Sequence, residues 1–148
     1  MSDNNIDRFD SLVGIIFEEV YSSFPKQIIL SPCKLMGYPE TQGYNSEGVF
    51  EHPLSDDDKE FFYYTVLWLK ESGFIIGDVT SVWDAKITLS LKGLQLLKTI
   101  PDSVSGKESL GDALKHAMVT GAKERAAKLV SDALSMNNVI NLISAAIN

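Results

Sequence analysis

The residues best suited to nucleophilic or acid–base chemistry are few, and they lie in one glycine- and proline-rich stretch. Glu51 and His52 are adjacent, and Cys33 lies upstream, directly after Pro32. If these side chains met, they could supply a nucleophile, a general base and a carboxylate that orients the base. No motif in the sequence requires that they meet. Among the three hypotheses about function that the sequence allows, an enzyme is therefore the least favoured. The sequence favours a protein that is not an enzyme.

Metal and phosphate chemistry also lacks a motif. The two histidines, His52 and His116, are far apart, and neither has a cysteine or second histidine at ligand spacing. The glycine-containing segment 43–48 is followed by neither a lysine nor the start of a helix, as a phosphate-binding loop would be. The acidic run 56–58 lacks the alternation of a calcium loop. The sequence thus predicts no metal and no cofactor.

Charge is distributed unevenly along the 148 residues. The formal net charge is -7, from 20 acidic and 13 basic side chains. Residues 1–60 carry 12 acids and 4 bases, whereas the rest of the chain carries 8 acids and 9 bases. The whole negative excess therefore belongs to the first 60 residues. This balance disfavours nonspecific nucleic-acid binding, which needs a basic face that releases counterions from phosphates.

The densest acidic run has two interpretations. Acidic side chains stabilise a helix N-terminus, where the macrodipole is positive. They could also form a face for a basic protein partner. Trp83 is either an exposed anchor, since tryptophan is frequent at binding hot spots, or a residue that folds back onto its own sheet. The predicted protein-binding residues are Asp56, Asp57, Asp58, Glu60, Tyr64 and Trp83.

Hydrophobic spacing predicts a mostly helical α+β chain. Helical patterns cover residues 6–23, 56–71, 91–100, 110–118, 126–134 and 139–147. Short strands are predicted at 28–30, 74–79 and 82–89, of which the last two form a β-hairpin with its tip within 78–83. Ser55 suits an N-cap. The inner stripe of the helix 56–71 is expected to hold Phe61, Phe62, Thr65, Val66, Trp68 and Leu69.

Residues 31–55 are the least regular part of the chain, because they are rich in proline and glycine. A loop of this length without secondary structure is uncommon in a compact domain, so we expect either a short helix within it or a function. The lone cysteine, Cys33, is predicted to be a buried structural thiol. A single thiol, no basic and apolar leader, and no run of 18 apolar residues predict a cytoplasmic protein without a membrane span.

Two short sequence motifs flank the predicted hairpin. The helix before it ends in Gly73-Phe74-Ile75, and the strand after it leads into Leu89-Ser90-Leu91-Lys92-Gly93. In residue type and order, these motifs resemble those of the winged-helix (winged helix-turn-helix) superfamily over residues 56–100. The resemblance implies a winged-helix-like domain over residues 1–100, and residues 101–148 then form a C-terminal helical extension packed on it.

A winged helix that reads DNA uses the helix before the hairpin, with basic and amide side chains facing the bases. Here the helix 56–71 carries five acids and only Lys59 and Lys70 as bases. We therefore interpret the chain as a cytoplasmic protein-interaction module with an acidic face for a basic protein partner. Small acidic immunity and antitoxin proteins are similar in size and charge.

The alternative interpretation is a winged-helix DNA-binding transcriptional regulator. Its nucleic-acid-binding residues would be Lys86, Lys92 and Lys98. A homodimer formed through the C-terminal helices remains open under either interpretation, and no membrane partner is expected.

Overall fold

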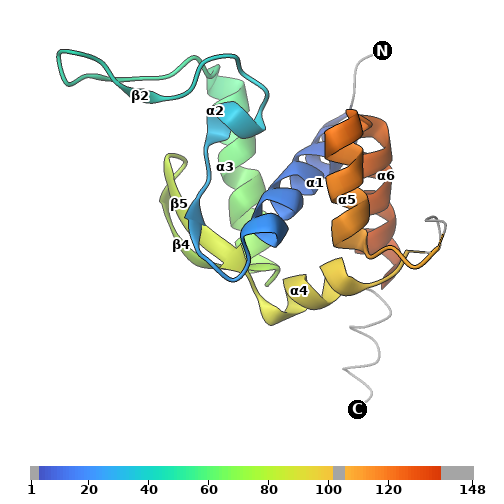
Figure 1. Ribbon diagram of the computed structural model, residues 1–148. Helices are drawn as coiled ribbons and strands as arrows, with labels where there is room; N and C mark the ends of the chain where they lie inside the picture. Colours follow the sequence, from blue (N-terminus) through green and yellow to red (C-terminus); the bar gives the residue numbers. More distant parts are fainter. Residues whose placement is uncertain (1–3, 102–105, 138–148) are drawn as a thin grey trace. The chain divides into compact units, whose positions relative to one another are not determined.

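The computed structural model describes residues 4–101 and 106–137 (Figure 1). These residues form two compact units. One unit comprises residues 19–94, and the other comprises residues up to 18 together with those from 95 onward. The contacts therefore group the start of the chain with its C-terminal helices, so the boundary between the units does not coincide with residue 100. The helix predicted over residues 139–147 lies outside the described residues.

The predicted α+β class is confirmed, and helices dominate the described residues. The helices are α1 (Asn5–Ser23), α2 (Pro32–Leu35), α3 (Asp56–Glu71), α4 (Leu91–Lys98), α5 (Leu110–Thr120) and α6 (Lys123–Asp132), and a π-helical turn, Ala133–Asn137, follows α6. The strands are β1 (Ile28–Ile29), β2 (Gly43–Tyr44), β3 (Phe50–Glu51), β4 (Ile75–Ser81) and β5 (Asp84–Leu89).

The unit of residues 19–94 contains two small antiparallel sheets. The larger sheet has the strand order β1-β5-β4, and Ile87 at its centre pairs with Ile28 on one side and Gly77 on the other. Strands β4 and β5 are joined at residues 82–83, which confirms the predicted hairpin. The second sheet pairs β2 with β3 in a separate hairpin, with Tyr44 opposite Phe50 (Figure 1).

The core of this unit forms because α3 buries one continuous side. Phe62, Thr65, Val66 and Leu69 follow the i, i+3, i+4, i+7 spacing of a helix face and are all buried. Buried side chains from the larger sheet and from the preceding segment join them: Leu30, Cys33, Leu35, Leu54, Phe74, Ile75, Ile87 and Leu89. The segment 31–55 contains the short helix α2, whose N-cap Ser31 accepts a bond from the Lys34 amide.

The two sequence motifs that flank the β4–β5 hairpin contact each other. Gly73 ends α3 with φ +84°, a conformation that favours glycine. The Ser90 hydroxyl donates a 2.5 Å hydrogen bond to the Gly73 carbonyl oxygen and accepts one from the Gly93 amide at 2.9 Å. A Cβ on Gly93 would lie 2.1 Å from the Phe74 carbonyl oxygen, so only glycine fits there. These two motifs therefore hold the end of α3 against the start of α4.

The other unit packs the first part of α1 against α5 and α6. Gly14 permits this close approach, since a Cβ at that position would touch Val130 and Ala126 of α6 and Leu114 of α5. Asp10, one turn before Gly14, is buried and hydrogen-bonds the Ser131 side chain. Burial, together with the charge of Asp7, raises the pKa of the Asp10 carboxyl, while the bond to Ser131 partly lowers it.

Across the described parts of the chain, no helix is long and apolar enough to cross a membrane.

Candidate protein-interaction surface

The exposed side of α3 carries a regular row of side chains. Asp56, Glu60, Tyr64 and Trp68 are spaced four residues apart, and all four are exposed. Residues at this spacing stack above one another on a helix surface. This row, here called the α3 stripe, places two carboxylates along the first half of the helix and two aromatic rings along the second half. The helix thereby brings together three predicted binding residues.

Trp68 corrects the predicted inner stripe of α3. We expected its side chain in the core, but it is 43% exposed, whereas the neighbouring Leu69 is buried. Consecutive helix residues point about 100° apart, so a core centred on Leu69 leaves Trp68 at its margin. Its ring stacks on Phe74, with centroids 6.2 Å apart, and thus has one covered side. Tyr64 is 65% exposed and contacts the Tyr63 ring.

The other two predicted acids lie in the first turn of α3. Asp57 is exposed, and Asp58 is half-buried. The amide of Asp58 donates a 3.1 Å hydrogen bond to the hydroxyl of Ser55, which confirms the predicted N-cap. The Asp58 carboxylate accepts a hydrogen bond from the Tyr38 hydroxyl. Asp58 therefore has a structural role, tying the preceding segment to the helix start, while Asp57 adds negative charge beside the α3 stripe.

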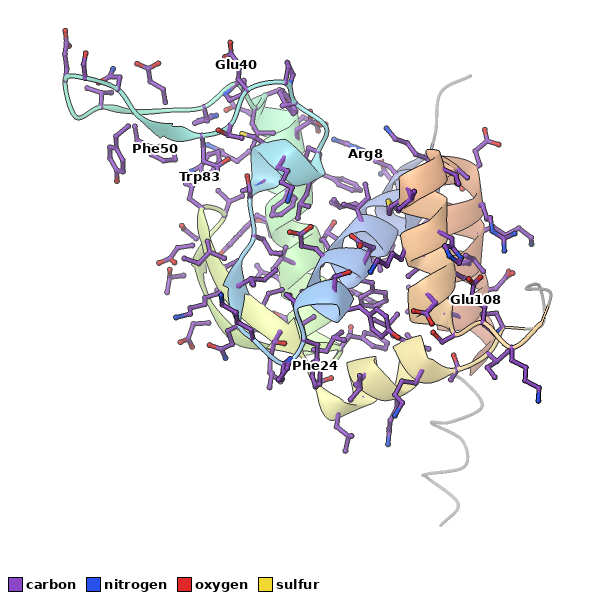
Figure 2. The ribbon with its side chains drawn as sticks, viewed as in Figure 1. Arg8, Phe24, Glu40, Phe50, Trp83 and Glu108 are labelled. Carbon is purple, nitrogen blue, oxygen red and sulfur yellow. The ribbon has the colours of Figure 1, made fainter. Side chains whose placement is uncertain are left out.

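Trp83 lies apart from the α3 stripe in sequence and in its contacts. It occupies the turn between β4 and β5, where its ring is half-buried against two rings of the segment after β2 (Figure 2). The centroids lie 5.1 Å from Phe50 and 4.6 Å from His52. Phe50 in turn meets Tyr44 edge-on at 5.3 Å. We call Tyr44, Phe50, His52 and Trp83 the ring cluster.

Two members of the ring cluster, Tyr44 and Phe50, pair across a hairpin arm, residues 43–51. Figure 1 shows the backbone of this arm. Asn45 shapes the turn, because its side-chain oxygen accepts from the amides of Glu47 at 2.8 Å and Val49 at 3.0 Å. Its amide group donates to the Glu51 carboxylate. Tyr44 and Val49 are exposed on this arm. The arm is therefore an ordered feature that presents apolar side chains to solvent.

The segment that leads from α2 through the arm to the first residues of α3 is acidic in sequence. Residues 35–58 contain six acids, and this stretch has no lysine or arginine. The acids are Glu40, Glu47, Glu51, Asp56, Asp57 and Asp58. The nearest basic side chains in the sequence are Lys34 and Lys59, which flank the stretch. Acidic side chains of this kind favour cationic over anionic ligands.

The three lysines predicted for nucleic-acid binding have different surroundings. Lys86 is exposed on β5, opposite Asp78 of β4. Lys92 is half-buried, and its ammonium group donates a 2.8 Å hydrogen bond to the Ser72 carbonyl oxygen. Lys98 ends α4 and belongs to the other unit. The described contacts join none of these lysines to another.

The residues considered for enzyme chemistry are engaged with different partners. Cys33 is fully buried, which confirms its predicted burial, and burial raises the pKa of its thiol. Glu51 accepts from Asn45, and the His52 ring packs on Trp83. His116 is exposed, and its Nδ1 atom contacts the Glu108 carboxylate. Over residues 4–101 and 106–137, no three His, Cys, Asp or Glu side chains gather in a way that could hold a metal ion.

The sequence analysis missed two features of this surface. Trp68 could have been found, since it follows the exposed Tyr64 by four residues and lies at the margin of the buried row. Phe50 offered no such signal, because its contact with Trp83 joins residues more than 30 positions apart, and Tyr44 reaches the cluster through Phe50. No family model matches the chain, and no curated protein or solved structure matches it significantly. The functional assignment therefore rests on the residues themselves.

Proposed function

We propose that the protein is a non-enzymatic interaction module that binds a basic protein partner through the α3 stripe. The observation that carries this proposal is the four-residue spacing of Asp56, Glu60, Tyr64 and Trp68 on one exposed helix side. Aromatic side chains provide the buried centre of many interfaces, and a charged rim sets specificity. The stripe offers both within one rigid element.

The charge of the surroundings determines the kind of partner. Asp57 lies beside the stripe, and the acid-only stretch 35–58 leads directly into α3. Complementary charge accelerates association and rejects partners of the same sign. A basic protein therefore fits this surface, and an immunity-like or antitoxin-like role, in which the partner is a basic toxin of the cytoplasm, is consistent with the size and charge of the chain.

We infer further that residues 19–94 have a winged-helix-like arrangement. The strand order β1-β5-β4, with α3 before the β4–β5 hairpin, supports this inference. In that arrangement α3 occupies the position of a DNA-reading helix. Its exposed acids would repel phosphates, so we propose that this helix position serves protein recognition.

Chemical cross-linking in the source cell, followed by calorimetry with the purified partner, tests the proposal. We expect the cross-linked partner to be basic. Reversing the charge of Asp56 and Glu60 to lysine should weaken its binding about tenfold or more, as loss of a complementary charge pair does. Tyr64→Ala should also weaken binding by about tenfold, as loss of a hot-spot ring does.

The matched control reverses two exposed acids of the other unit, Asp112 and Glu124, to lysine. This variant has the same net charge as the stripe variant, so equal weakening in both would show only a bulk charge effect and would overturn the assignment to α3. An acidic partner would overturn it as well.

The DNA-binding alternative makes the opposite prediction. A regulator should retard random duplex DNA in a mobility-shift assay at about 50 mM salt, where phosphate contacts are strong. Lys86→Glu should then abolish the shift. Binding that behaves in this way would replace the protein-interaction proposal.

A further inference from the structure

The ring cluster is a second surface feature that the α3 stripe does not use. Its four rings touch in sequence from the arm to the turn between β4 and β5: Tyr44 meets Phe50, Phe50 meets Trp83, and Trp83 meets His52. One member of the cluster is more exposed than the others. Tyr44, at the outer end, is 77% exposed, whereas the other three are half-buried. A ligand can therefore approach the exposed Tyr44 ring, which already packs against Phe50.

Two carboxylates lie close to these rings in the sequence. Glu47 belongs to the arm, and Asp84 directly follows Trp83. The Glu51 carboxylate, by contrast, is bonded to Asn45, and Glu51 pairs with Gly43. Asp84 is exposed, and its carboxylate accepts a 2.9 Å hydrogen bond from the Thr80 hydroxyl, which fixes its position. The stretch 35–58, which includes Glu47, contains no lysine or arginine. Held aromatic faces beside carboxylates attract a flat cation that can stack and donate hydrogen bonds together.

We propose that the ring cluster binds an arginine side chain of the basic partner, and this inference rests on the proposed function. Arginine fits better than lysine, because its guanidinium group is planar, stacks on aromatic rings and pairs with a carboxylate through two hydrogen bonds. A nucleic-acid base could also stack on the rings. Sites that bind single-stranded nucleic acid are positively charged, however, whereas here the phosphates would meet carboxylates. A protein segment is therefore the occupant.

The chain contains two tryptophans, one in each surface feature, which makes the two sites separately observable. In the Trp68→Phe variant, Trp83 is the sole source of tryptophan emission and reports on the ring cluster. In the Trp83→Phe variant, Trp68 reports on the α3 stripe. Both substitutions keep an aromatic ring, and circular dichroism of each full-length variant checks that it is folded.

The probes are two repeat peptides of about twelve residues, glycine–arginine and glycine–lysine, which differ in the cation alone. We expect the arginine peptide to change Trp83 emission saturably in the Trp68→Phe protein, with an affinity about threefold or more above that of the lysine peptide. Adding Tyr44→Ala should weaken arginine-peptide binding by about threefold. Val119→Ala, at a side chain of similar exposure (79%) in the other unit, is the matched control and should leave it unchanged.

Three results would overturn the inference: no saturable change of Trp83 emission, equal affinity for the two peptides, or a Trp83 response to single-stranded DNA in place of the peptide. Failure of the proposed function looks different. In that case Trp83 still responds to the arginine peptide, while charge reversal at Asp56 and Glu60 leaves the natural partner's affinity unchanged.

Discussion

Lys92 closes the end of α3 by donating a 2.8 Å hydrogen bond from its ammonium group to the carbonyl oxygen of Ser72, the C-cap residue of the helix. The same ammonium group lies 4.4 Å from the centre of the Phe74 ring. A cation at this point balances the negative end of the helix dipole and gains from the ring. One side chain thus joins the last turn of α3 to the first turn of α4.

Lys92→Ala should therefore lower the free energy of unfolding by about 1 to 2 kcal/mol, because a charge-assisted hydrogen bond is lost. Urea unfolding followed by circular dichroism measures the change. Lys26→Ala removes an exposed lysine from a loop of the same unit and should change stability by less than about 0.5 kcal/mol. Equal losses in both variants would contradict the role given to Lys92.

Gly93→Ala should destabilise the protein by about 2 to 3 kcal/mol, even though alanine favours a helix by about 1 kcal/mol. The added Cβ would lie 2.1 Å from the Phe74 carbonyl oxygen and 3.0 Å from Leu89, so the backbone must move. Gly43→Ala is the control, since a Cβ there meets nothing within 4 Å. Thermal unfolding of both variants decides the matter. A Gly93→Ala protein as stable as the parent would refute the close approach.

Asp10 should make stability depend on pH. Its pKa in the folded protein is raised above 3.8, mainly by burial and secondly by Asp7. The folded state therefore keeps this proton at pH values where the unfolded state has lost it. The resulting stabilisation is complete below about pH 3.8 and is lost as pH rises through the folded-state pKa. Asp10→Asn removes the titration and should be the more stable protein at neutral pH.

Urea unfolding of the parent and of Asp10→Asn over about pH 3 to 7 tests this sign. The difference in unfolding free energy should grow in favour of the variant as pH rises. A difference that stays constant would show that folding does not shift the pKa of Asp10, and one that grows in favour of the parent would show that folding lowers it; either result would contradict the prediction.

His52→Phe should keep or raise the free energy of unfolding. The Nδ1 atom of His52 is shielded from solvent and has no hydrogen-bond partner among the described residues. A buried polar atom without a partner costs about 1 to 3 kcal/mol, and phenylalanine removes it while keeping a ring against Trp83. His52→Ala should be destabilising, because that ring contact is lost. Equal losses of stability in the two variants would contradict the prediction, because they would indicate that Nδ1 of His52 forms a hydrogen bond that both variants remove.

Local signals predicted the helices well. The bounds of α3 follow from Ser55, whose hydroxyl accepts the Asp58 amide, and from Gly73, whose backbone has a positive φ. The β4–β5 hairpin was also predicted, although its turn was placed only within 78–83. Each of these features depends on residues that are close in sequence, so a pattern can reveal them.

The surface was less predictable, for two physical reasons. Periodicity shows that α3 has an apolar side, but a pattern that includes both Trp68 and Leu69 does not say which one lies at the centre of the core. The arm depends on pairing Tyr44 with Phe50 and on packing against Trp83. Contacts between distant segments form only when the whole unit folds, and no periodic pattern records them.

The acid-only stretch 35–58 also governs how copies of the chain meet. The arm has short strands with unpaired outer edges, which in a neutral hairpin invite edge-to-edge pairing with another molecule. Here two approaching arms bring carboxylates of the same sign together, and self-association is opposed. The charge that we propose to attract a basic partner thus also opposes aggregation of the free protein, and this opposition weakens when salt screens the carboxylates or acid protonates them.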